Sequence, residues 1–205
     1  RRRNAYYSNV DVVGIQKTWM VLIFHGSINF LNMKFLLSLF LIVLSGFDLL
    51  AQSDPESKLK ELGISLPVMS KPVANYVKYV QTGKLIYLSG HGPKNSKGED
   101  ITGKVGAGTS IDQGSDAARA CAIQLISTLK DATGGDLKKV KRIVKVLGMV
   151  NCTPDFTDQP KVMNGCSDLL VAVFGEKGKH ARSAVGTNAL PNNMVVEIEM
   201  IVEVE

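Results

Sequence analysis

The stretch "NMVVEIEMIVEVE", residues 193–205, alternates apolar and acidic side chains, which predicts a β-strand with one buried face. Side chains of a strand point alternately to its two faces. The apolar face consists of Val196, Ile198, Met200, Val202 and Val204. The acidic face consists of Glu197, Glu199, Glu203 and Glu205. An acidic face of an antiparallel sheet is normally solvated; the alternative is that one of these carboxylates faces a cleft.

Two amphipathic helices are predicted to cover the apolar face of that strand. Between Asp112 and about Thr133, apolar residues recur at steps of three and four, and Gly134 and Gly135 follow as a stop signal. The stretch "PKVMNGCSDLLVAVFG", residues 160–175, repeats this pattern. The apolar positions are Ala118, Cys121, Ala122, Leu125 and Leu129 in the first helix and Val162, Cys166, Leu169 and Val173 in the second.

The remaining segments predict a mixed sheet. A short helix is expected in "SDPESKLKELG" (53–63), a hairpin in "ANYVKYV" (74–80) and "KLIYLSG" (84–90), and a strand in "VKRIVKVLGMVN" (140–151). Residues 90–108 carry six glycines and predict a long loop. The order helix, β, β, α, β, α, β indicates an α+β fold with both long helices on one face of the sheet.

The N-terminal part of the chain is predicted to lie outside this domain. Residues 33–53 resemble a secretory signal, with Lys34, a short apolar run over 35–44 and small residues near Ser53. The run is too short for a membrane-spanning helix. We therefore expect an upstream extension over 1–32, a signal over 33–53 and one domain over 54–205. The domain would be exported, or cytoplasmic if the signal is not used, with no stable membrane anchor.

Charge and composition exclude several functions. The net charge of +5 arises mainly in residues 1–51, which hold five of the 24 basic and two of the 19 acidic residues, leaving 19 basic and 17 acidic beyond them. No nucleic-acid partner is expected from so weak a balance. The three cysteines and three histidines lack the spacing of a metal site, and the glycines of "GKVGAG" (103–108) match no phosphate-binding motif. Neither a metal nor an organic cofactor is predicted.

Several separated motifs resemble one known family. These are "YVKYVQTGKLIYLSGHGPKNSKGE" (76–99), "NG" (164–165), and "HARSAVG" (180–186) followed by "LPNNMVVEIE" (190–199). Over about residues 58–205 the chain is similar to the RidA/YjgF family, and most similar to its YoaB-like branch. The resemblance implies a chorismate-mutase-like α+β fold, a homotrimer and ligand clefts between subunits. Active members hydrolyse enamine and imine acids, such as 2-aminoacrylate, to 2-keto acids and ammonia without a cofactor.

The resemblance also implies the site residues. Arg182 matches the arginine that holds the substrate carboxylate, and Glu197 matches the glutamate that positions water. Imine hydrolysis needs these elements: a positioned water, a base and a complement to the acid. An arginine in a strand-like stretch such as "ARSAV" (181–185) also has a structural interpretation, as an exposed residue or the partner of a structural carboxylate.

Five further positions match the family's substrate-binding residues: Tyr76 of the expected first strand, the backbone at Ser89, Gly90 and His91, and Asn164 of the second helix. The side chain of His91 has three interpretations: a loop residue beside glycines, a surface hydrogen-bonding group, or a proton donor in the cleft. The family often has a glutamine at the position of His91.

Two interpretations of function stay open. The first is a deaminase of small imino acids. The second is a module of the same fold that binds a small carboxylate or a protein partner without turnover, because Ala184 stands where deaminating members often have a cysteine. A ribonuclease activity fits poorly with the nearly neutral domain.

Overall fold

The computed structural model describes residues 54–68 and 75–205. The predicted extension (1–32) and the predicted signal (33–53) lie outside the described residues. Among the residues that are described, no helix has the length and apolar character needed to cross a membrane. The same residues contain no group of three or more His, Cys, Asp or Glu side chains that could hold a metal ion.

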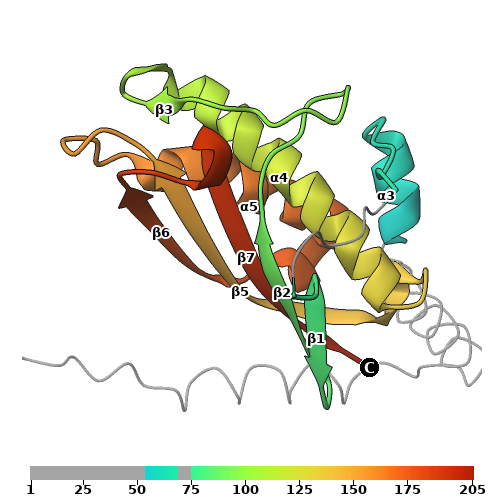
Figure 1. Cartoon of the computed structure of the whole chain (residues 1–205). Coiled ribbons are helices and arrows are strands. Elements are labelled where there is room, and N and C mark those ends of the chain that lie inside the picture. Colours follow the sequence, from blue (N-terminus) through green and yellow to red (C-terminus); the bar gives the residue numbers. More distant parts are fainter. Residues whose placement is uncertain (1–53, 69–74) are drawn as a thin grey trace, which may run out of the picture. The chain divides into compact units, whose positions relative to one another are not determined.

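The centre of the domain is a five-stranded mixed sheet in the order β1-β2-β7-β5-β6. The pairs β1–β2, β2–β7 and β7–β5 are antiparallel, and β5–β6 is parallel. The C-terminal strand is therefore the middle one, as Figure 1 shows. The strands are β1 (Tyr79–Thr82), β2 (Leu85–His91), β5 (Val140–Asn151), β6 (Ala181–Thr187) and β7 (Val196–Val204).

Two helices cover one face of this sheet (Figure 1). Helix α4 (Ile111–Ala132) begins at a capping box in which Ser110 and Gln113 each accept a hydrogen bond from the other's backbone amide. Helix α5 (Gln159–Phe174) ends at Gly175, whose φ of 59° favours glycine. The short helix α3 (Pro55–Glu61) is capped by the Asp54 side chain. The predicted α+β architecture, with both long helices on one face, is confirmed.

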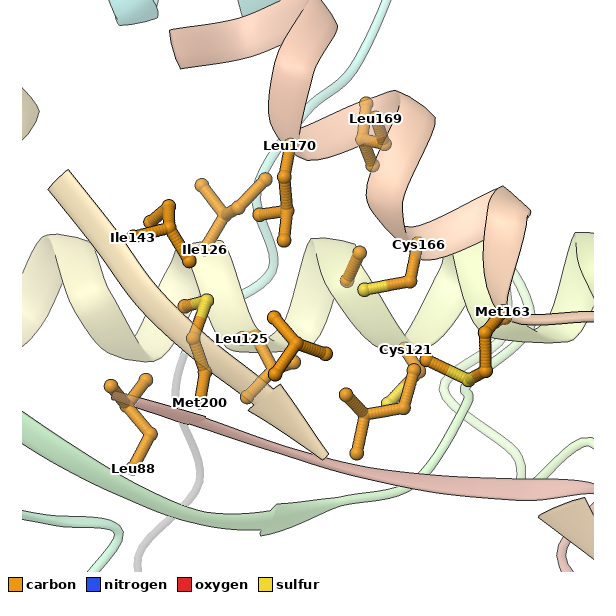
Figure 2. Packing of buried hydrophobic residues seen from close by; sticks show 14 of the residues in the cluster. Leu88, Cys121, Leu125, Ile126, Ile143, Met163, Cys166, Leu169, Leu170 and Met200 are labelled. Atoms are coloured by element: carbon orange, nitrogen blue, oxygen red, sulfur yellow. The ribbon is translucent and has the colours of Figure 1, made fainter. Parts of the chain in front are cut away.

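The core lies between the sheet and these helices, as Figure 2 shows in close-up. The five alternating residues predicted for the apolar face of β7 are all buried, as are the predicted helix positions. Cys121 and Cys166 are fully buried. Burial raises the pKa of both thiols, that of Cys166 to about 12, so they are protonated core residues. The two helices approach closely at Gly165, where a Cβ would overlap the carbonyl oxygen of Ser115.

Two details of the predicted order are wrong. The expected order omits the strand-like stretch "ARSAV" between the second helix and the last strand, yet this stretch belongs to β6, which forms an edge of the sheet. Its sequence "ARSAVGT" has no apolar alternation, so its backbone pairing with β5 defines it as a strand. The hairpin's first strand begins at Tyr79, not at residue 74, so Tyr76 precedes the strand.

The connections contain short structured turns. The loop predicted over 90–108 includes β3 (Lys104–Val105) and β4 (Gly108–Thr109), which pair in parallel. The buried side chain of Asn151 anchors this loop by donating to the carbonyl of Gly103 (2.9 Å). The 3-10 turns are η1 (Leu137–Lys139), η2 (Gly175–Gly178) and η3 (Pro191–Asn193).

Candidate functional site

Arg182 lies on the edge strand β6, on the face that the helices cover. It stands opposite Val146 of β5, and Val146 is fully buried beneath the helices. The guanidinium donates through Nη1 to Asn164 Oδ1 (3.1 Å) and to Ser167 Oγ (3.0 Å), both on α5. The structure thus brings together two predicted site residues, Arg182 and Asn164.

The guanidinium of Arg182 is held by neutral acceptors. Within the described part of the chain, no carboxylate lies in ion-pair distance of Arg182, and both of its hydrogen bonds use Nη1. A guanidinium has five N–H donors, so the edge formed by Nε and Nη2 keeps its capacity for a bidentate carboxylate. The interpretation of Arg182 as the partner of a structural carboxylate therefore finds no support among the described residues.

Two polar side chains that the sequence did not single out as site residues also belong to this cluster. Ser167 Oγ lies 3.2 Å from Nε2 of His180, and Nδ1 of His180 donates to the carbonyl of Gly178 (2.7 Å). The signal for them was the spacing: Asn164 and Ser167 are three residues apart on a helix, and His180 and Arg182 are two residues apart on an extended segment. The first spacing places Asn164 and Ser167 on one side of α5, and the second places His180 and Arg182 on one side of the extended segment.

Ser89 and Gly90 form an irregularity near the end of β2. Leu88 pairs with Met200 and His91 with Ile198, so two β2 residues intervene where β7 has one, as in a β-bulge. The hydroxyl of Ser89 donates to the carbonyl of Val77 (2.7 Å), and its amide donates to the carbonyl of Lys78 (2.9 Å). These bonds fasten the segment after Tyr76 to the bulge. Tyr76 itself is 55% exposed.

Glu197 lies on β7, on the face turned away from the helices, because its neighbours Val196 and Ile198 are buried on the helix side. A Cβ on Gly90 would overlap Glu197 Oε1, so the carboxylate lies directly over the bulge. Burial raises the pKa of Glu197, and the charge of Glu199 raises it further. Glu197 is therefore partly withdrawn from solvent over the bulge, and Glu199 lines a hollow of the same face, so the alternative that an acidic residue of β7 faces a cleft is favoured.

His91 is neither a loop residue nor a surface group, which corrects two of its interpretations. It ends β2 and is only 9% exposed. Its Nδ1 donates to the Ser89 carbonyl (2.6 Å), and Nε2 lies 2.7 Å from the hydroxyl of Thr128 on α4. Burial is the main cause that lowers its pKa, so the ring is neutral near pH 7. With the ring turned toward α4, only the backbone of His91 remains as a candidate for substrate binding.

The candidate residues thus form two groups. Arg182, Asn164 and Ser167 lie where β6 meets α5, whereas Glu197, Ser89 and Gly90 lie where β7 meets β2. Along the sheet, Arg182 stands level with Val146, and Glu197 stands level with Met149 three residues further along β5. Arg182 points to the helix-covered face and Glu197 to the opposite face, so one chain does not bring them together.

The face opposite the helices carries apolar side chains and a hollow of about 430 Å³. Val80, Tyr87 and Val185 on this face are 55%, 43% and 44% exposed. Leu147 and Ile201 line the hollow together with the polar groups of Ser89, Lys145 and Glu199. Such an apolar, partly hollowed face is typical of an association surface.

A family model identifies the class of protein that this fold and site define. Residues 56–204 match the family described as "YjgF/chorismate_mutase-like, putative endoribonuclease". The chain belongs to this family, which is the RidA/YjgF family inferred from its motifs.

Individual proteins are also similar to this chain. The chain is 47% identical over 148 residues to Protein TCP17 of Trypanosoma cruzi, covering 72% of this chain and 92% of that protein. It is 30% identical over 143 residues to a 2-iminobutanoate/2-iminopropanoate deaminase of Dermatophagoides farinae, covering 69% of this chain and 95% of the relative. Among solved structures, Atu1372 of Agrobacterium tumefaciens, a protein of unknown function, is similar with a TM-score of 0.69 and 42% identity, over 75% of this chain and 96% of that chain.

Proposed function

We propose that this protein hydrolyses small reactive 2-imino acids, formed from enamines such as 2-aminoacrylate, to 2-keto acids and ammonia. The observation that carries the proposal is the state of Arg182, a half-buried cation anchored on neutral acceptors with no carboxylate partner among the described residues. A guanidinium in this state suits the carboxylate of a small acid. The reaction named for the deaminase relative of Dermatophagoides farinae supports the reaction class.

Glu197 is the proposed general base. Its carboxylate accepts a proton from water as the water oxygen bonds to C2 of the imino acid and the C=N electron pair moves to nitrogen. Glu197 returns this proton to the nitrogen, which gives a tetrahedral intermediate with a C2 hydroxyl and an amino group. The intermediate then collapses: the hydroxyl proton passes to the amino nitrogen, the C–N bond breaks, and the keto acid and ammonia are released. The raised pKa of Glu197 suits this role. A base that takes up a proton and later gives it back works best when its pKa is close to the pH of the reaction, and burial moves the pKa of Glu197 toward neutral pH.

The proposed site is shared between copies of the chain. Arg182 and Glu197 lie on opposite faces of one sheet, and a molecule with a three- or four-carbon backbone cannot reach both through it. A second copy packed on the apolar face would supply the missing partner, in agreement with the homotrimer that the family resemblance implies. The exposed side chains of Tyr87 and Val185, and the hollow that Tyr87 lines, support association through this face.

One observation favours a second candidate, a non-catalytic module that binds a small carboxylate. Ala184 stands opposite Gly148 and packs against the core, so this position brings no ionisable group near Arg182. With the His91 ring also turned away, proton transfer would depend on Glu197 alone. A site with Arg182 but an inactive Glu197 would bind keto acids and release no ammonia.

The deciding experiment measures ammonia and keto-acid release from freshly generated 2-iminopropanoate and 2-iminobutanoate, using protein that begins at Asp54. Release above the spontaneous rate, abolished in the Glu197→Gln variant, is expected for the deaminase. Keto-acid binding in calorimetry with no rate enhancement would indicate the binding module. Absence of both would contradict the assignment of Arg182 as a carboxylate ligand.

A further inference from the structure

We propose that Ser167 and His180 are positioning residues that hold the guanidinium of Arg182 in the orientation required for a substrate carboxylate. The proposal rests on the proposed function, because it takes Arg182 as the carboxylate ligand. It adds two residues that contact no substrate themselves and act through Arg182.

The hydrogen-bond directions within this cluster follow from the chemistry of its members. A carbonyl oxygen only accepts, so His180 Nδ1 carries the proton in its 2.7 Å bond to Gly178. In the neutral ring, Nε2 is then an acceptor, and the hydroxyl of Ser167 donates to it across 3.2 Å. The Ser167 oxygen in turn accepts from Arg182 Nη1 at 3.0 Å. The chain of bonds runs from Arg182 through Ser167 and His180 to the backbone of η2.

The neutral state of His180 is consistent with its surroundings. Burial lowers the pKa of its ring most, and the positive charge of Arg182 lowers it further, whereas the bond to Gly178 raises it. Because an imidazolium has no acceptor nitrogen, only the neutral ring can orient the Ser167 hydroxyl in this way. The backbone of Gly178, which is buried under α5, provides the rigid end of the chain.

This arrangement has a geometric consequence for the ligand. Nη1 of Arg182 is fixed by two acceptors on α5, Asn164 and Ser167. The Nε–Nη2 edge is therefore presented in one orientation, and a pre-positioned fork loses less conformational entropy when it binds a carboxylate. Without Ser167 and His180, one bond to the exposed Asn164 would remain, and the guanidinium would rotate more freely.

The test compares four variants. Ser167→Ala removes the hydroxyl, and His180→Asn keeps a donor for the Gly178 carbonyl but removes the acceptor for Ser167. Ser167→Thr restores the hydroxyl. Ser127→Ala is the matched control, because it removes a serine hydroxyl that donates to Pro67 and takes no part in this cluster.

The first measurement needs no ligand: nitrogen-15 NMR of the Arg182 side chain in protein beginning at Asp54. We expect separate, slowly exchanging Nη1 and Nη2 signals in the wild type, averaged signals in Ser167→Ala and His180→Asn, and wild-type signals in Ser167→Thr and the control. The second measurement is calorimetry with pyruvate and 2-ketobutyrate. Loss of one hydrogen bond predicts a Kd raised roughly threefold to tenfold in Ser167→Ala, with recovery in Ser167→Thr.

The outcomes separate this inference from the proposed function. Unchanged Arg182 signals in both Ser167→Ala and His180→Asn would overturn the positioning role, whether or not keto acids bind. Altered signals in these variants, together with a wild-type protein that neither releases ammonia from imino acids nor binds keto acids, would overturn the proposed function and leave the positioning of Arg182 established. If turnover is found, a raised KM with nearly constant kcat in Ser167→Ala supports positioning, and an equal loss of kcat in Ser167→Ala and Ser167→Thr contradicts it.

Discussion

Arg182 and Glu197 belong to strands on either side of β5, yet their side chains lie on opposite faces of the sheet. Arg182 donates to α5 on the helix side, and Glu197 lies over Gly90 on the open side. The two residues inferred to bind and activate a substrate are thus separated by the sheet within one chain. Under the proposed function, Arg182 and Glu197 can act on one substrate molecule only if a second copy of the chain supplies one of them.

The first prediction concerns assembly. Protein beginning at Asp54 should form a trimer in light scattering at micromolar concentration. The Tyr87→Glu variant should dissociate, because it places a charge in the hollow of the open face. Leu62→Glu is the control: Leu62 is 40% exposed but lies at the end of α3, away from the sheet, and its variant should remain trimeric. A stable wild-type monomer would require a different cleft.

The second prediction concerns recognition of the carboxylate by Arg182. Arg182→Lys keeps the charge but loses the planar fork, so the Kd for pyruvate or 2-ketobutyrate should rise roughly tenfold or more. Arg182→Ala should weaken binding further. Calorimetry measures both, and circular dichroism checks that the fold is kept. Equal affinities in wild type and both variants would assign Arg182 a structural role.

The third prediction concerns the pH dependence of turnover. Glu197 acts as a base only when ionised, so kcat/KM should fall as the pH drops through its raised pKa. Glu199→Gln removes a nearby negative charge that raises this pKa, and the acid limb of the profile should therefore move to lower pH. Glu197→Gln should reduce turnover roughly a hundredfold or more while keto-acid binding persists. An acid limb that stays in place in Glu199→Gln would argue against Glu197 as the titrating group.

The fourth prediction compares two glycines. A Cβ at Gly90 would overlap the flexible carboxylate of Glu197, so Gly90→Ala should displace the base, reduce turnover and leave stability within about 0.5 kcal/mol of wild type. A Cβ at Gly165 would overlap the backbone of Ser115, which cannot move without separating α4 from α5. Gly165→Ala should therefore cost about 1–3 kcal/mol or more. Urea denaturation of both variants measures the contrast, and equal stability losses would contradict it.

The fifth prediction concerns His91 and stability. Its folded-state pKa is lowered, so as the pH falls below about 6.5 the unfolded chain takes up a proton that the folded ring resists. The free energy of unfolding should therefore decrease with falling pH until the folded-state pKa is passed. His91→Gln should reduce this slope by up to about 1.4 kcal/mol per pH unit. Urea denaturation between pH 5 and 7.5, at fixed protein concentration, checks it; an unchanged slope would show that the ring titrates normally.

His180 should make the free energy of unfolding decrease with falling pH in the same way, because burial and the charge of Arg182 lower its pKa too. The His180→Asn variant should therefore remove a separate part of the slope. If the double variant His91→Gln/His180→Asn keeps the full wild-type dependence of the unfolding free energy on pH, neither histidine causes that dependence.

The family and its fold were predictable from the sequence because their signals are local. The alternation in 193–205 identified the buried face of β7, and the steps of three and four identified the buried faces of α4 and α5. The chain beyond these periodic segments was harder to interpret. Residues 181–187 lack alternation, and their strand conformation depends on hydrogen bonds to β5, more than thirty residues earlier in the chain.

The sequence by itself determined which side of each element is apolar and which residue types are available for chemistry, because periodicity and composition are properties of short segments. Only the tertiary structure decided that β6 pairs with β5, that Arg182 meets Ser167 and that the His91 ring enters the core against Thr128. It also decided that Glu197 faces away from Arg182. These relationships join residues from 15 to 37 positions apart, and they depend on the order of strands and the packing of helices across the sheet.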